Sequence, residues 1–161
     1  MPLGIRVKFW LFEYYGWLVC IAVAAAIVML FVMKERVTTI MTVVGSLLSV
    51  AYFLQKQKLE ELRIFREIFK ECNERYDAMN DFLIPISERE KDEGLSAEEI
   101  LKIIDYLNLC GEEYLYFKRG YIEPSVWQAW HNGMKKIISS PCIINVWKKE
   151  KETGSYYDLP L

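Results

Sequence analysis

Two long apolar runs stand near the start of the chain, at residues 17–33 and 37–54, and only Lys34, Glu35 and Arg36 separate them. Neither run contains a charged residue. As α-helices the runs would be about 25–27 Å long, close to the thickness of the hydrocarbon core of a bilayer. The pattern therefore predicts a tight transmembrane hairpin, because a helix bonds its own backbone as lipid requires. The alternative, a buried hairpin of a soluble protein, is disfavoured because soluble cores rarely need two such runs in succession.

The helical pattern continues beyond the second run. Residues 37–84 contain no proline and a single glycine, Gly45. Further along, apolar positions alternate spacings of three and four, which is typical of the buried seam of a bundle helix. These positions are Leu62, Phe65, Phe69, Cys72, Tyr76, Met79 and Leu83. We therefore expect one long helix that ends at Pro85; a break near residues 55–58 is the open alternative.

Start and stop signals divide the rest of the chain. Residues 87–94 are polar and charged and predict a surface loop, and Ser96 with Glu99 forms the capping-box pattern of a helix start. Gly120 is placed to end that helix in the left-handed conformation. Prolines after Glu123 and Ser140 mark two further helix starts, because proline is tolerated at the first helical position. Residues from 154 onward read as a tail.

Each of these later helices has an apolar inner face. The three faces consist of Ile100, Ile103, Ile104, Leu107, Cys110, Tyr114 and Phe117; Val126, Trp127, Trp130, Met134 and Ile137; and Ile143, Ile144 and Trp147. No β-strand pattern is visible. We expect an all-α chain, with an N-terminal interfacial segment and two-helix transmembrane hairpin at residues 1–54 and a small cytosolic bundle of about four helices at residues 55–161.

Basic residues are more frequent on the terminal side of the hairpin than on its loop side. The terminal side carries Arg6, Lys8, Lys56, Lys58, Arg63, Arg66 and Lys70, and the loop side carries Lys34 and Arg36. The positive-inside rule then predicts a hairpin in the plasma membrane with both termini in the cytoplasm. A cleaved signal peptide is disfavoured by the long apolar run and the second run directly after it. Small and hydroxyl residues in the two runs allow close helix packing and hydrogen bonds between helices, either within the hairpin or between copies of the chain.

Motifs of catalysis are absent from the sequence. There is no glycine-rich phosphate loop, no GxSxG and no HExxH, so we expect no enzyme activity and no cofactor. The four cysteines are scattered singly and there is one histidine, which predicts no metal site. Glu112 and Glu113 are adjacent, so their side chains diverge on a helix, and we expect one of them to pair with the basic part of the chain.

Charge is divided unevenly along the predicted bundle. Residues 55–113 contain nine Lys or Arg against sixteen Asp or Glu, whereas residues 114–151 contain seven against two. Basic and aromatic side chains alternate in the second stretch, which suits phosphate neutralisation and base stacking. The candidate ligand-binding residues are Lys118, Arg119, Trp130, His131, Lys135 and Lys136. The competing interpretation is that the tryptophans are core and the lysines are solvated surface that complements helix dipoles.

Several phrases of the predicted bundle resemble a scattered group of small bacterial membrane proteins of unassigned function. They are YLNLCGEEY at residues 106–114, GYIEPSVWQAW at 120–130, NGM at 132–134, NERYD at 73–77, and Asn80. The layout also resembles the small membrane effectors of type III CRISPR systems, in which a two-span anchor carries a helical cytosolic domain that binds cyclic tetraadenylate. That resemblance implies a tetramer whose cytosolic domains enclose the ring-shaped ligand, with damage to the membrane as the output.

Two functions follow as expectations. The first is an antiviral-defence effector that binds an anionic second messenger, with cyclic tetraadenylate as the best candidate, and perturbs the membrane as a homo-oligomer, because two spans cannot enclose a pore. The second is a membrane-anchored adaptor whose bundle binds a protein partner and no nucleotide. The expected partners are thus the lipid bilayer, further copies of the chain and an oligoadenylate or other anion, and not duplex nucleic acid.

Overall fold

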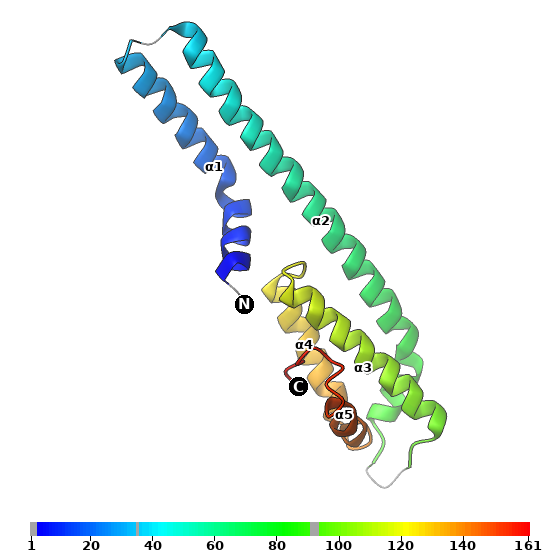
Figure 1. Ribbon diagram of the computed structural model, residues 1–161. Coiled ribbons are helices and arrows are strands. Elements are labelled where there is room, and N and C mark those ends of the chain that lie inside the picture. Colours follow the sequence, from blue (N-terminus) through cyan, green and yellow to red (C-terminus); the bar gives the residue numbers. More distant parts are fainter. Residues whose placement is uncertain (1–2, 35, 91–93) are drawn as a thin grey trace. The chain divides into compact units, whose positions relative to one another are not determined.

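The protein is described by a computed structural model that covers residues 3–34, 36–90 and 94–161 (Figure 1). Glu35 of the expected hairpin turn and residues 91–93 of the expected loop lie outside the described residues. The five helices are α1 (Leu3–Val32), α2 (Val37–Ser87), α3 (Ala97–Lys118), α4 (Pro124–Ile138) and α5 (Ile144–Lys151). No strand occurs in the described ranges, so the prediction of an all-α chain is confirmed.

The chain forms two compact units, Met1–Arg63 and Ile64–Leu161. In the first unit, α1 and the beginning of α2 form an antiparallel hairpin (Figure 1). Lys8 pairs with Glu61, and the Lys58 ammonium donates to the Phe12 carbonyl oxygen at 2.7 Å, so both contacts lie at the open end of the hairpin. Both helices are long and apolar enough to span a membrane, and none of the residues in their apolar windows is buried.

The hydroxyl groups of the second run do not bond to α1. Thr42, Ser46 and Ser49 each donate to the carbonyl oxygen four residues earlier in α2, at 2.8–2.9 Å. Hydrogen bonds from these three residues to the other helix of the hairpin are therefore absent, whereas their packing between copies of the chain stays a prediction. The physical reason is that the carbonyl of the preceding turn is always within reach of a helical Ser or Thr, whereas a partner on another helix requires a close approach.

The second unit is a small bundle around α3. This helix contacts α4 and α5, and its Tyr106 ring lies 6.2 Å from the ring of Tyr76 in α2. Three of its fully buried residues, Ile103, Leu107 and Cys110, belong to one core that α2, α4 and α5 complete. The predicted inner faces are thus largely confirmed, although Leu62 and Phe69 of the α2 seam and Ile100 of the α3 face are exposed.

Local signals set most helix ends. The Ser96 hydroxyl accepts from the Glu99 N–H (3.2 Å) and the Glu99 carboxylate accepts from the Ser96 N–H (2.8 Å), which confirms the capping box. Gly120 has φ +77°, in the left-handed region expected after α3, and Pro124 is the first residue of α4.

Two predicted ends are wrong by a few residues. Helix α2 passes through Pro85 and ends at Ser87, because a proline this near the end removes little helical bonding while Ile86 is buried in the core. The last helix does not begin at Pro141. Residues 141–143 form turns, with Cys142 and Ile143 buried, and α5 begins at Ile144.

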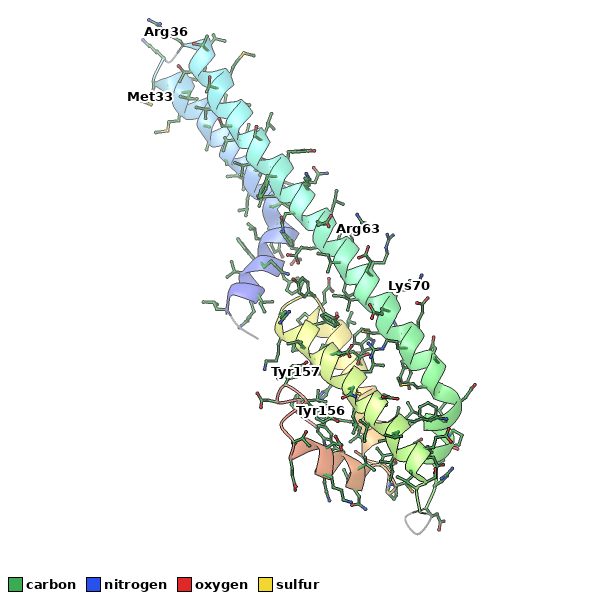
Figure 2. All side chains as sticks on the ribbon, turned by 45° about the vertical axis from the view of Figure 1, so that its right-hand side comes forward. Met33, Arg36, Arg63, Lys70, Tyr156 and Tyr157 are labelled. Atoms are coloured by element: carbon green, nitrogen blue, oxygen red, sulfur yellow. The ribbon has the colours of Figure 1, made fainter. Side chains whose placement is uncertain are left out.

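The C-terminal residues are packed and do not form a free tail. Tyr156 and Leu159 are buried in the core, and the Tyr156 hydroxyl donates to the Glu150 carboxylate at 2.9 Å. Figure 2 shows Tyr156 and Tyr157 within the second unit. The chain turns back at Gly154 (φ +70°) and meets α3 at Gly111, where an added Cβ would lie 3.4 Å from the Tyr156 ring. The expectation of a tail from residue 154 is therefore wrong for these residues, since Gly111 gives them a place to pack.

Candidate functional site

An open cavity of about 410 Å³ lies between the last turn of α4 and helix α5. Three lysines line it, Lys135 from α4 and Lys148 and Lys151 from α5. The aromatic ring of Trp147, which is almost fully buried, forms part of the wall. The cavity therefore combines several cations with an apolar, aromatic surface.

The three lysines differ in their contacts. Lys151 donates to the main-chain oxygen of Leu161 at 2.5 Å, and its ammonium lies 5.5 Å from the centre of the Trp147 ring. Lys135 and Lys148 are exposed, and neither forms an ion pair with a residue that the structure describes. Lys102 on α3, in contrast, pairs with Glu98 at 3.0 Å. Two cations at the cavity are thus available for an external anion.

The other predicted basic residues lie outside this cavity. Lys136 is exposed but does not line it. Lys118 donates to the Tyr157 carbonyl oxygen at 3.1 Å and lies 3.9 Å from the Asp158 carboxylate. Arg119 is exposed at the C-terminal cap of α3. Of the four predicted cations, only Lys135 lines the cavity.

The two predicted ring residues already have partners inside the protein. Trp130 is half-buried and stacks on Phe69, with ring centres 5.5 Å apart. His131 stacks on Trp127 at 5.2 Å, and its Nε2 lies 3.0 Å from the Pro160 carbonyl oxygen. A carbonyl only accepts, so this contact requires the proton on Nε2. Ligand binding by either ring stays a prediction.

Glu112 and Glu113 of α3 do not have the partners that the sequence predicts. Arg75 of α2 donates to both Glu112 carboxylate oxygens, at 2.5 and 3.3 Å. Pairing of Glu112 with the basic stretch 114–151 is therefore wrong, because the face of α3 that carries Glu112 meets α2. Glu113 follows in sequence and points into the unit, where it is 7% exposed. Burial, together with the nearby Glu112 charge, raises the pKa of Glu113 to about 8 despite the opposing effect of Arg75.

The cysteines of the second unit, Cys72, Cys110 and Cys142, are buried. Burial raises the pKa of Cys72 to about 12 and that of Cys110 well above its ordinary value, so both thiols stay protonated near neutral pH. Within the described ranges, no three His, Cys, Asp or Glu side chains lie together as a metal ion would require.

Comparison of the sequence with protein-family models, with curated proteins and with solved structures finds no match. The geometry described above is therefore the basis for a functional assignment.

The basic stretch at residues 114–151 contains all three lysines of the cavity, but the candidate ligand-binding residues include only Lys135 of the three. Lys148 and Lys151 belong to the basic stretch but not to the candidate residues, because their proximity to Lys135 depends on the packing of α5 against α4. The buried position of Glu113 was also missed. Its place next to Cys110 and Tyr114, on the buried side of α3, was the available signal.

Proposed function

We propose that this protein is a membrane-anchored receptor whose second unit, Ile64–Leu161, binds an anionic ligand at the cavity lined by Lys135, Lys148 and Lys151. The observation that carries the proposal is the convergence of three lysines from two helices on one open cavity. Unpaired cations beside an aromatic wall suit a phosphate joined to a flat base.

The size of the cavity limits what one copy can hold. Ligand pockets usually have volumes of roughly 300–1,000 Å³, so a cavity of about 410 Å³ suits one nucleotide-sized group. A cyclic tetraadenylate would need the cavities of several copies. The size is thus compatible with a homo-oligomer, a tetramer in the simplest case, around one ring-shaped ligand.

The proposed output is in the membrane. Both helices α1 and α2 can cross a bilayer by length and composition, and the excess of basic residues on the terminal side of the hairpin supports a cytoplasmic position of the termini in a bacterial cell. Ligand binding to the second unit would then alter the packing of hairpins in the oligomer and perturb the inner membrane, as an antiviral-defence effector would. Helix α2 runs without interruption from the candidate span to the second unit and would carry the change.

Adjacent lysines provide a matched test. The full-length chain in detergent micelles is titrated with cyclic tetraadenylate, and Lys135→Gln is compared with Lys136→Gln. Both variants lose one charge at the end of α4, but only Lys135 lines the cavity. A charge-assisted contact is worth about 1.5–3 kcal/mol, so Lys135→Gln should weaken binding by about ten- to a hundredfold and Lys136→Gln by less than about twofold.

Other outcomes would redirect the proposal. Affinity should fall steeply with added salt, because phosphate contacts release counterions. Equal effects of the two substitutions would move the site away from the cavity. A folded wild type that binds neither cyclic tetraadenylate nor other cyclic or linear oligonucleotides would exclude nucleotide binding and favour the adaptor function.

A further inference from the structure

A second, smaller cavity of about 150 Å³ lies where α2, α3 and α4 meet. Three aromatic side chains line it, Tyr76, Tyr106 and Trp130. The single carboxyl group in its wall belongs to Glu113, whose side chain is more than nine-tenths buried. Among the residues that the structure describes, none forms a hydrogen bond or ion pair with this carboxyl group.

Burial of a carboxyl group that lacks a hydrogen-bond or ion-pair partner costs free energy, and a bound ligand can supply the missing partner. The charged side chains closest to it are already engaged, because Arg75 is bound by Glu112 at 2.5 Å and lies 3.9 Å from Glu71. The titratable groups that face it from α2 are Cys72 and Tyr76, and from α3 they are Tyr106 and Cys110. Helix α4 contributes uncharged residues to the cavity wall, Ala129, Trp130, Gly133 and Met134.

We propose that this cavity is a binding site for a small organic ammonium ion, which the Glu113 carboxylate neutralises and the surrounding aromatic rings contact through their faces. Aromatic rings attract cations through their negative faces, and cages of several rings recognise quaternary ammonium groups. The volume equals about five water molecules at roughly 30 Å³ each, which is enough for a group such as tetramethylammonium.

The surrounding charges favour a free ammonium over a lipid headgroup. Arg75, which acts on Glu113 together with Glu112, is shared by the carboxylates of Glu112 and Glu71, so these three side chains carry one net negative charge. A phosphate attached to the ammonium would be repelled by these carboxylates, so choline should bind better than glycerophosphocholine.

Binding of an ammonium ion at this cavity should release a proton from Glu113. The pKa of Glu113 in the empty cavity is about 8, so the carboxyl is mostly neutral at pH 7. A bound cation favours the ionised form, so binding should release close to one proton at pH 7. Affinity should rise by about tenfold per pH unit up to about pH 8 and level off above it.

The test is isothermal titration calorimetry of the full-length chain with choline, tetramethylammonium and glycerophosphocholine. The micelles are of maltoside detergent, because phosphocholine detergents carry the same ammonium group. Titrations in two buffers of different ionisation enthalpy count the released protons. The neutral carbon isostere of choline, in which carbon replaces the nitrogen, serves as the control for size and shape and should bind at least tenfold more weakly.

Matched variants test whether ammonium binding and proton release occur at this cavity. Glu113→Gln keeps the volume and removes the charge, so it should abolish ammonium binding and proton release. Asp105→Asn removes an exposed carboxylate of the same helix and should leave both unchanged. Trp130→Leu should weaken binding but keep the pH dependence, which separates the aromatic contribution from that of the carboxylate.

Three results would overturn the proposal. They are absence of ammonium binding by the folded wild type at pH 8.5, equal binding of choline and its neutral isostere, and wild-type affinity in Glu113→Gln. None of these measurements involves the lysine cavity, so they leave the proposal for an anionic ligand unaffected.

Discussion

Trp127 joins α3 to α4 through ring contacts. It is 7% exposed, and its ring lies 5.0 Å from Phe117 and 5.2 Å from Tyr114. Trp127→Ala would leave a cavity among these rings, so we expect a loss of about 3–5 kcal/mol in the free energy of unfolding. Urea denaturation of the full-length chain in micelles measures this change. Trp130→Ala is the comparison on the same helix and should cost less, because Trp130 is only half-buried; an equal or larger loss would contradict the assignment of Trp127 to the core.

Glu99 gives a prediction about acid stability. Its carboxylate accepts from Arg89 at 2.6 Å and from the Ser96 N–H, and these hydrogen bonds lower its pKa from the ordinary 4.5 to about 2. A lowered pKa stabilises the folded state above the unfolded pKa, and that stabilisation is lost as the pH falls through the folded pKa. Glu99→Gln should therefore be less stable than the wild type at pH 7, with the difference fading between pH 4.5 and 2.

The matched control for this experiment is Glu98→Gln. Glu98 is exposed and pairs only with Lys102 one turn away, so its removal should change the melting temperature little at any pH. A difference between wild type and Glu99→Gln that persists at pH 2 would show that Glu99 acts through packing and not through its charge.

At the scale of elements, several local signals were sufficient, although the prolines at 85 and 141 did not mark the helix ends expected of them. The capping box at Ser96, the left-handed Gly120 and the proline that opens α4 each depend on one or two neighbouring residues, and each was predicted correctly. The C-terminal segment was not predicted, because the burial of Tyr156 depends on Gly111, more than forty residues away. The lysine cavity was not predicted for the same reason, because its lysines come together only when α4 and α5 pack in the folded chain.

Packing of the C-terminal segment on α3 can be tested at Gly111. A Cβ there would already touch Tyr156 at 3.4 Å, so the branched side chain of Gly111→Val has no space and should displace residues 155–161. We expect faster proteolysis of this segment, measured by mass spectrometry after limited digestion. Gly133→Val introduces the same side chain in α4, where nothing lies within 4 Å of the added Cβ, and should leave the segment protected. Equal digestion of both variants would exclude this role of Gly111.

At the scale of the whole molecule, α2 belongs to both units. It is 51 residues long, begins in a candidate span and ends with Leu83 and Ile86 in the core of the second unit. The charged contacts of the hairpin, Lys8 with Glu61 and Lys58 with Phe12, lie at the end opposite to the turn. Polar contacts at this end suit the headgroup region of a membrane, where charged side chains remain hydrated. The hairpin thus has the distribution of charge that a two-span anchor needs.

The orientation of this anchor is the final prediction. From the excess of basic residues on the terminal side we expect the C-terminus in the cytoplasm and the turn near Arg36 outside. A membrane-impermeant maleimide applied to intact bacterial cells should therefore label Arg36→Cys, whereas Ser155→Cys should react only after the cells are permeabilised. Both positions are exposed in the structure, so access by the reagent and not burial decides the result. The wild type, which contains four native cysteines, gives the background and should stay unlabelled in intact cells. Labelling of Ser155→Cys in intact cells would show that the C-terminus lies outside, where the lysine cavity could not bind a cytoplasmic ligand. Protection of both positions in intact cells would contradict the prediction that the hairpin crosses the membrane.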